Sequence, residues 1–90
     1  MINSQVADIV AKLSDYVLSN YPSKYTTETL PLDQSLVELE VLDSAAVIEL
    51  IVFIESTWGF EIPDQDITKE RMGSLNKMAA LVQEYTARKQ

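Results

Sequence analysis

The sequence of 90 residues contains no cysteine and no histidine. Without them the chain cannot form a disulfide, a Cys/His zinc site, a thiol nucleophile or a Ser-His-Asp triad. Histidine is also the commonest general base in enzymes. We therefore expect that the protein is not an enzyme, and a binding or carrier role becomes the leading interpretation. The length leaves room for one hydrophobic core, so residues 1–90 are expected to form a single domain.

Basic residues are scarce, with 7 lysines and arginines against 14 aspartates and glutamates and a formal net charge of −7. Nucleic acids and anionic membranes bind positively charged protein surfaces, so neither is an expected partner. Between Tyr25 and Thr68 the chain has ten acidic residues and no basic one. This stretch is either an ordinary solvated acidic surface or the source of a field that attracts basic partner proteins.

Long apolar segments are also missing. The residues from Met1 to Val10 lack a basic start followed by an apolar run, so no secretory signal peptide is expected. The longest apolar runs flank Glu49 and, with Glu55 close by, are too short to cross a membrane. We expect a cytoplasmic protein that behaves as a monomer.

Apolar periodicity predicts a first helix that ends near Asn20, ahead of Pro22, with Asn3 or Ser4 as its cap. A long irregular connection over residues 20–42 follows, in which Asp33 is expected to cap one short turn. A connection of this length needs anchors in the core, and its leucines are the candidates. These are Leu30, Leu32, Leu36, Leu39 and Leu42.

A second helix is predicted from Asp43 or Ser44 to about Thr57, and Gly59 is expected to end it. Seven of the eight residues from 47 to 54 are apolar. A helix that is apolar almost all round must bury more than one face or meet a partner. The spacing of Leu50, Ile54 and Trp58 predicts the face that packs on the core.

The last third of the sequence predicts two more helices. A short one over Gln65–Arg71 is expected to start with Asp64 as its cap, and Gly73 separates it from a final helix capped by Ser74. The expected fold class is therefore all-α: a four-helix bundle with three main helices, one short helix and a long first loop.

The most informative residues are Leu42-Asp43-Ser44, Glu49-Leu50 and Ile62-Pro63-Asp64. An isolated Asp-Ser pair before an apolar run is no more than a helix cap. The full spacing, however, resembles the acyl carrier protein and peptidyl carrier protein family, whose pattern is Asp-Ser-Leu, then Glu-Leu, then Ile-Pro-Asp. No gap is needed to match this pattern, and the order of helices matches the acyl-carrier bundle over roughly the whole chain.

In that family the serine carries a 4′-phosphopantetheine arm, derived from coenzyme A, that ends in a thiol. The resemblance implies that Ser44 is the attachment residue and that Asp43 helps the modifying transferase and its Mg²⁺ to bind. The chemistry of the residues agrees, because a serine at the first position of a helix lies beside unpaired N–H groups that favour a phosphate. No cysteine thiol competes for an activated acyl group.

Two residues depart from the family pattern. Ala45 stands where the family usually has leucine, and Glu40 lies in a stretch where the family commonly has glycine. The first change affects the surface that partner enzymes meet, not the attachment itself. The spacing before Ser44 is similar to that of stand-alone carriers of amino acids, such as D-alanyl and prolyl carriers, more than to that of fatty-acid carriers.

The resemblance also implies partner enzymes and a face that binds them. The expected partners are a phosphopantetheinyl transferase, an adenylating enzyme that loads an acyl or aminoacyl group, and downstream biosynthetic enzymes. The partner-binding residues are expected to be Ala45, Ile48, Glu49, Val52, Glu55 and Asp64. Glu38 and Glu40 extend the acidic surroundings that attract basic partner surfaces. Ile51 either packs against the long loop, which we favour, or belongs to an apolar docking strip.

The resulting functional expectation is a carrier protein that holds its cargo as a thioester on the arm at Ser44 and presents it to separate enzymes. The alternative is an unmodified helical adaptor module, in which Ser44 is only part of a helix cap. The cargo stays open among fatty acyl, amino acid, pyrrolyl and polyketide groups.

Overall fold

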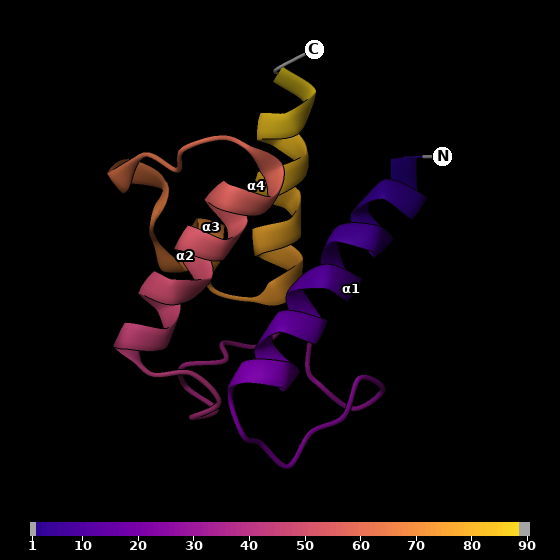
Figure 1. The fold of residues 1–90 in the computed structure, drawn as a ribbon, viewed down its shortest axis with the longest axis vertical. Helices are drawn as coiled ribbons and strands as arrows, with labels where there is room; N and C mark the ends of the chain where they lie inside the picture. Colours follow the sequence, from indigo (N-terminus) through magenta and orange to yellow (C-terminus); the bar gives the residue numbers. More distant parts are fainter. Residues whose placement is uncertain (1, 89–90) are drawn as a thin grey trace.

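The computed structural model describes residues 2–88, with side chains from Gln5 onward, and within that part of the chain the secondary structure is entirely helical (Figure 1). Three long helices, one short helix and a long connection after the first helix confirm the predicted all-α bundle. The elements are α1 (Ile2–Asn20), α2 (Ser44–Trp58), the 3₁₀ turn η1 (Asp64–Asp66), α3 (Lys69–Met72) and α4 (Leu75–Arg88).

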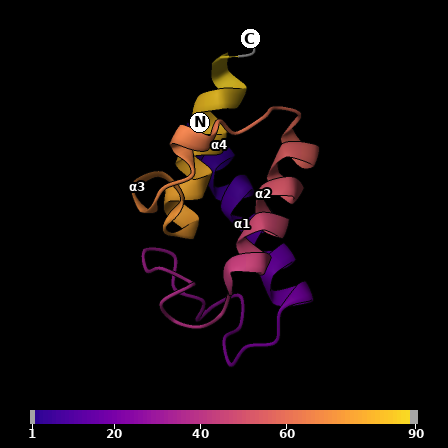
Figure 2. The same cartoon turned by 90° about the vertical axis from the view of Figure 1, so that its left-hand side faces the viewer.

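The long connection covers one end of the bundle, and α2 starts at that end. α1 packs against α4, and two perpendicular views show α2 running beside this pair (Figures 1 and 2). The start of α1 and the end of α4 lie at the opposite end of the bundle (Figure 1). The first residues of α2 are therefore presented on an end of the molecule that is built from loop.

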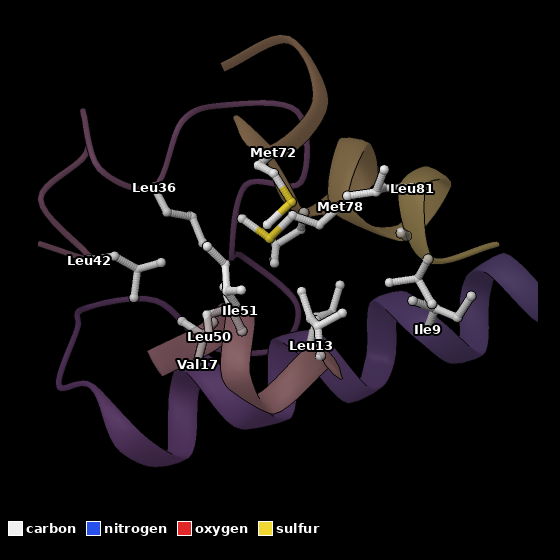
Figure 3. Packing of buried hydrophobic residues seen from close by; sticks show 14 of the residues in the cluster. Ile9, Leu13, Val17, Leu36, Leu42, Leu50, Ile51, Met72, Met78 and Leu81 are labelled. Carbon is white, nitrogen blue, oxygen red and sulfur yellow. The ribbon is translucent and has the colours of Figure 1, made fainter. Parts of the chain in front are cut away.

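The core is formed by apolar side chains of α1, α2 and α4 together with those of the connection. Leu13 and Val17 of α1, Leu50 of α2, and Met78 and Leu81 of α4 are fully or almost fully buried and point toward one another (Figure 3). Burying each such side chain contributes about 1.5–3 kcal/mol of hydrophobic free energy. This core fixes α2, and with it Ser44, relative to the rest of the bundle.

Three of the five predicted leucine anchors, Leu30, Leu36 and Leu42, are buried in the core, and Leu39 is partly buried against it. Val41 is buried as well. The prediction for Leu32 is wrong, because its side chain is 36% exposed. At this point the chain is held by its backbone instead. The carbonyl of Leu32 accepts a hydrogen bond of 3.0 Å from the N–H of Asn76 at the start of α4.

Two capping predictions in the first half of the chain are wrong. α1 already includes Asn3 and Ser4, since it begins at Ile2, so neither residue precedes the helix as a cap. Asp33 does not cap a turn of the connection. Its Oδ1 accepts a hydrogen bond of 2.6 Å from Nδ2 of Asn76, which ties the connection to α4 by a side-chain contact.

The segment after α2 is split where one short helix was predicted. The backbone of Ile67 (φ −86°, ψ 75°) is not helical, so η1 and α3 are separate. Asp64 is the first residue of η1 and makes no cap, whereas Oγ1 of Thr68 accepts from the N–H of Arg71 at 3.2 Å and caps α3. The prediction that Asp64 caps a helix over Gln65–Arg71 is therefore wrong.

The two glycines end helices as predicted. Gly59 follows α2 in the left-handed conformation (φ 74°), and its N–H donates to the Glu55 carbonyl at 2.9 Å. A Cβ on Gly73 would lie 2.3 Å from the carbonyl oxygen of Lys69, so this position has no room for a side chain. Ser74 then caps α4, because its Oγ accepts from the N–H of Lys77 at 3.2 Å.

Candidate functional site

Ser44 is the first residue of α2, and it is exposed. Asp43 is the N-cap residue, with extended backbone and with Oδ1 accepting a hydrogen bond of 2.8 Å from the N–H of Ala46. Its carbonyl accepts from the N–H of Val47 at 3.0 Å. Because Asp43 does the capping, the hydroxyl of Ser44 has no hydrogen-bond partner among the described residues. It stands at the positive end of a helix of 15 residues.

A single helical turn precedes Asp43 and directs the chain into α2. Oγ of Ser35 accepts from the N–H of Glu38 at 3.2 Å and starts this turn, in the role that was predicted for Asp33. The N–H of Leu39 then donates to the Ser35 carbonyl at 3.1 Å. Serine is a preferred residue at such a start because its side chain satisfies a backbone donor that the turn leaves free.

The same turn ends in the hydrogen-bond pattern of a Schellman motif. The N–H of Glu40 donates to the Val37 carbonyl at 3.0 Å, and the N–H of Val41 donates to the Leu36 carbonyl at 2.9 Å. Val41 and Leu36, which bracket the motif, are both buried. The motif requires a left-handed residue in the middle, which is usually glycine, and Glu40 occupies that position with φ 63°.

A pocket of about 680 Å³ opens beside Ser44. Its walls come from Tyr21 and Pro22 after α1, from Val37 and residues 40–43 of the connection, and from residues 44–46 and Glu49 of α2. This volume lies in the range of small-molecule sites. Three side chains predicted for the site, Asp43, Ser44 and Ala45, line the pocket together with Glu49. The structure thus brings these four predicted residues together.

Three carboxylates line this pocket, and they differ in their partners. Asp43 holds the helix cap, and Glu49 accepts a hydrogen bond from the phenol of Tyr21. Hydrogen bonding to the Glu49 carboxylate, with a further contribution from desolvation, holds the pKa of Tyr21 well above its usual range. The Glu40 carboxylate makes no hydrogen bond or ion pair among residues 5–88.

The outward face of α2 beyond Ser44 is apolar. Ala45 is exposed, and the side chains of Ile48 and Val52 are 63% and 55% exposed. Ile51 is only 7% exposed and belongs to the core cluster together with Leu36 of the connection (Figure 3). Its expected packing in the interior is therefore confirmed, and it forms no part of an exposed strip.

Two further predicted partner residues lie near the other end of α2. Glu55 is half-buried, and its Oε2 accepts a hydrogen bond of 2.9 Å from the N–H of Ile62. This contact holds the segment that follows α2 and occupies one oxygen of the Glu55 carboxylate. Asp64 is exposed in η1. Neither residue lines the pocket at Ser44.

Tyr21 and Val37 were not predicted as part of the site, although both line its pocket. Nothing in their spacing distinguishes Tyr21 from the other tyrosines or Val37 from the other apolar residues of the connection. Their positions depend on how the connection folds back over the end of α1. The sequence contains one indication of this part of the site: Glu40 lies where the family commonly has glycine. A glycine position in a family pattern indicates a backbone conformation that other residues disfavour, and Glu40 has φ 63°.

No described helix combines the length and the apolar composition that crossing a membrane requires. No family model matches the chain. A chain in the crystal structure of an FAD-dependent dehydrogenase superposes with a TM-score of 0.61, over 82% of this chain and 97% of that chain, at 24% sequence identity. At this identity the likeness shows the fold alone.

Curated relatives are more informative. D-alanyl carrier proteins of Lactococcus lactis subsp. cremoris, strains MG1363 and SK11, are 40% identical to this chain over 55 residues, which cover 61% of this chain and 70% of each relative. The D-alanyl carrier protein of Lactococcus lactis subsp. lactis, strain IL1403, is 40% identical over 53 residues, or 59% of this chain and 67% of the relative. Together with the helical bundle, these matches confirm the resemblance found in the sequence. The chain therefore belongs to the acyl carrier protein family that includes the D-alanyl carrier proteins, and it is a non-catalytic carrier protein.

Proposed function

We propose that Ser44 carries a 4′-phosphopantetheine arm and that the protein holds an amino acid on this arm as a thioester. The observation that carries the proposal is the exposed Ser44 hydroxyl, which is free of the helix cap and opens onto the pocket of about 680 Å³. Membership of the carrier family supports the same assignment.

The residues present at the site fit the prosthetic group. Its phosphodiester is an anion, and the start of α2 offers free N–H groups and the positive end of the helix dipole. Its pantetheine part is uncharged, and the pocket supplies apolar walls from Val37, Val41 and Ala45. When bound, the group supplies a thiol, which a chain without cysteine lacks.

The modification is a phosphoryl transfer to Oγ of Ser44. The Oγ–P bond forms as the pyrophosphate bond of coenzyme A breaks, the hydroxyl proton leaves to a base of the transferase, and 3′,5′-adenosine bisphosphate is released. In our proposal Asp43 holds the first turn of α2 in place and assists the transferase and its Mg²⁺. Its carboxylate already uses Oδ1 for the cap, so Oδ2 is the oxygen left to contact an enzyme.

The relatives favour an amino acid as the cargo, since they are D-alanyl carrier proteins. We propose that an adenylating enzyme activates the amino acid and transfers it to the arm at Ser44. The test is to offer the modified protein to adenylating enzymes supplied with D-alanine, other amino acids or a fatty acid. An amino acid bound as a hydroxylamine-sensitive thioester is the expected product, and exclusive loading of a fatty acyl group contradicts the proposal.

The partner enzymes are proposed to dock on the apolar outer face of α2, at Ala45, Ile48 and Val52, beside the acidic pocket wall at Glu49. An exposed isoleucine buried in an interface contributes about 1.5–3 kcal/mol before the costs of association. Substitution of Ile48 by aspartate is expected to slow loading while the fold stays intact. The partners are a phosphopantetheinyl transferase, the loading enzyme and downstream biosynthetic enzymes.

The decisive experiment for the proposed function is intact mass after incubation with coenzyme A and a broad-specificity phosphopantetheinyl transferase. The wild-type chain is expected to gain one phosphopantetheine group, and Ser44→Ala is expected to gain none. Ser56→Ala, at another exposed serine of α2, is the matched control and should be modified like the wild type. An unchanged wild-type mass would favour the unmodified adaptor instead.

A further inference from the structure

The three carboxylates in the wall of the Ser44 pocket are not equally available to a partner. Asp43 accepts the cap hydrogen bond of 2.8 Å from Ala46, and Glu49 accepts the phenol of Tyr21. Glu40 is exposed and has no polar partner among the described side chains. Of the acids beside Ser44, Glu40 alone keeps both carboxylate oxygens free to meet an incoming group.

Glu40 also occupies a backbone position that disfavours it. With φ 63° it is the one residue other than glycine with a left-handed backbone among residues 2–88. The hydrogen bonds from Glu40 to Val37 and from Val41 to Leu36 fix this conformation. A glycine would satisfy the same motif without strain, because the left-handed region costs L-residues energy through their Cβ. Glutamate is therefore not at this position for the stability of the turn.

The reaction at Ser44 determines what the Glu40 carboxylate faces. Coenzyme A has a pyrophosphate and a further phosphate, so an enzyme that binds it must surround these anions with cationic groups. The attacked phosphorus has to come within bonding distance of the Ser44 oxygen. A side chain close to Ser44 in the wall of this pocket is then expected to lie next to the cationic rim of the enzyme's coenzyme A site.

We propose that Glu40 is a specificity-determining residue for the modification of Ser44, and that its carboxylate pairs with a basic side chain of the phosphopantetheinyl transferase. This inference rests on the proposed function, since it requires that Ser44 is the modified residue. It assigns this ion pair to one carboxylate and not to the general negative charge of the region, because each of the two neighbouring carboxylates already accepts a hydrogen bond within the chain.

The test compares Glu40→Gln with Glu28→Gln, which removes the same charge from an exposed position of the same acidic segment, outside the pocket. The full-length chain is modified with coenzyme A and a phosphopantetheinyl transferase, and kcat/KM is measured at low and at high salt. Glu40→Gln is expected to lower kcat/KM about three- to tenfold at low salt and to weaken its salt dependence. Glu28→Gln is expected to stay within about twofold of the wild type, since Glu28 does not line the pocket at Ser44.

A third variant separates recognition from stability. Glu40→Gly is expected to raise Tm by about 2–6 °C while lowering kcat/KM as much as Glu40→Gln does.

Equal rates for the wild type and both Glu40 variants overturn the inference but leave the proposed function intact. Equal losses for Glu40→Gln and Glu28→Gln overturn it in favour of a general effect of the negative charge of the segment. A lower Tm for Glu40→Gly would show that glutamate does not strain the turn, and this overturns the inference. A wild-type chain that is never modified overturns the inference together with the proposed function.

Discussion

Asp43 and Ser44 divide two tasks that one serine could have performed. Both residue types are good N-caps, and a serine that capped α2 itself would direct its oxygen toward the backbone. Here the Asp43 carboxylate accepts the N–H of Ala46, and the Ser44 hydroxyl is left on the surface. The Asp-Ser pair therefore caps the helix through Asp43 and leaves the Ser44 hydroxyl exposed at its start.

Substitution of Asp43 by alanine is expected to destabilise the fold by about 1 kcal/mol, because α2 loses its side-chain cap. For a domain of this size the loss corresponds to a decrease in Tm of about 4–8 °C. Asp43→Asn is the control, since an amide oxygen can accept the same hydrogen bond. Thermal unfolding of both variants is the measurement, and equal losses for alanine and asparagine would show that the cap contributes nothing.

The contact between Tyr21 and Glu49 predicts a loss of stability at alkaline pH. The hydrogen bond to the carboxylate raises the pKa of Tyr21 in the folded state, so the folded chain keeps a proton that the unfolded chain releases above pH of about 10. The stabilisation that this hydrogen bond gives the fold is therefore complete below a pH of about 10 and declines as the pH rises above that value.

Chemical denaturation across this range should therefore show a shallower decline for Tyr21→Phe than for the wild type. Tyr25→Phe is the control, because no hydrogen bond of its phenol occurs among the described residues. The explanation fails if the Tyr21→Phe and wild-type profiles fall in parallel above pH of about 10.

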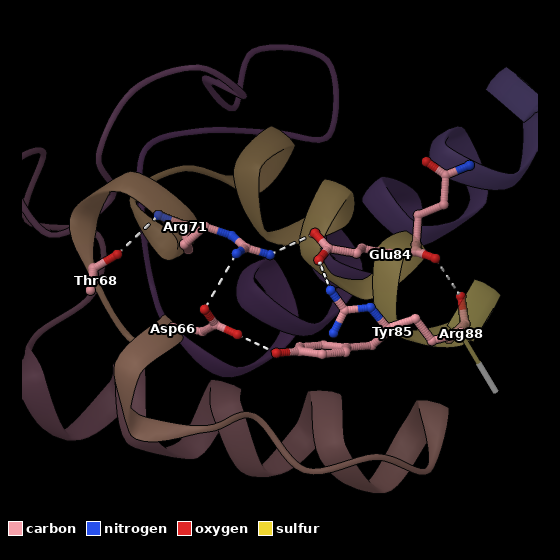
Figure 4. Close-up of polar contacts among 8 residues, drawn as sticks. Asp66, Thr68, Arg71, Glu84, Tyr85 and Arg88 are labelled. Atoms are coloured by element: carbon pink, nitrogen blue, oxygen red, sulfur yellow. Dashed lines mark hydrogen bonds and ion pairs between the residues drawn. The ribbon is translucent and has the colours of Figure 1, made fainter.

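At the scale of elements, η1 and α3 are held to the bundle mainly by polar contacts. Asp66 accepts from the phenol of Tyr85 and pairs with Nη1 of Arg71 at 3.3 Å, while Nη2 of Arg71 pairs with Glu84 at 2.7 Å (Figure 4). Met72 is the one buried residue of η1 and α3. A short segment with so little burial is expected to open locally at low cost in free energy.

Arg71→Gln is expected to loosen η1 and α3 while α1, α2 and α4 stay folded, because Arg71 joins Asp66 to Glu84 across two elements. Arg88→Gln is the matched control. Its pair with Glu84 at 2.6 Å lies within α4 and connects no second element. Amide hydrogen exchange should accelerate over residues 64–72 in the first variant alone. Acceleration in both variants, or in neither, would contradict this account.

The same segment shows where sequence reasoning reached its limit. Its existence was predicted, but the predicted cap, Asp64, is wrong, and Thr68 caps α3 instead. Asp66 instead pairs with Tyr85 and Arg71, contacts that depend on where α4 lies. The helix cap at the Asp-Ser pair was predicted correctly, because the hydrogen bond that Asp43 accepts involves only a residue that follows closely in the chain.

For the whole molecule, α2 has one face in the core and another on the surface. Leu50 is completely buried, whereas Ile48 is 63% exposed. Leu50→Ala is expected to cost about 2–5 kcal/mol of unfolding free energy because it leaves a cavity in the core. Ile48→Ala is expected to change stability by no more than about 0.5 kcal/mol. Urea denaturation measures both, and a large loss for Ile48→Ala would show that its side chain is buried.

The overall bundle was predictable because apolar periodicity specifies which faces must be buried, as with Leu13, Val17 and Leu50. The path of the connection was less predictable from the sequence. Leu32 is exposed although it has the same side chain as the buried Leu36, and the connection is held there by the backbone hydrogen bond from Asn76. The left-handed backbone of Glu40 and the place of Tyr21 in the pocket likewise depend on contacts between distant parts of the chain.

The central claim is that the Ser44 oxygen is the atom that becomes modified, and peptide mass spectrometry tests it most directly. Residues 25–68 contain no lysine or arginine, so trypsin releases one peptide from residue 25 to Lys69, with Ser35, Ser44 and Ser56 as its serines. After treatment with coenzyme A and a transferase, fragmentation of this peptide is predicted to place a single phosphopantetheine on Ser44. A group on Ser35 or Ser56, or a peptide without any added mass, would contradict the account.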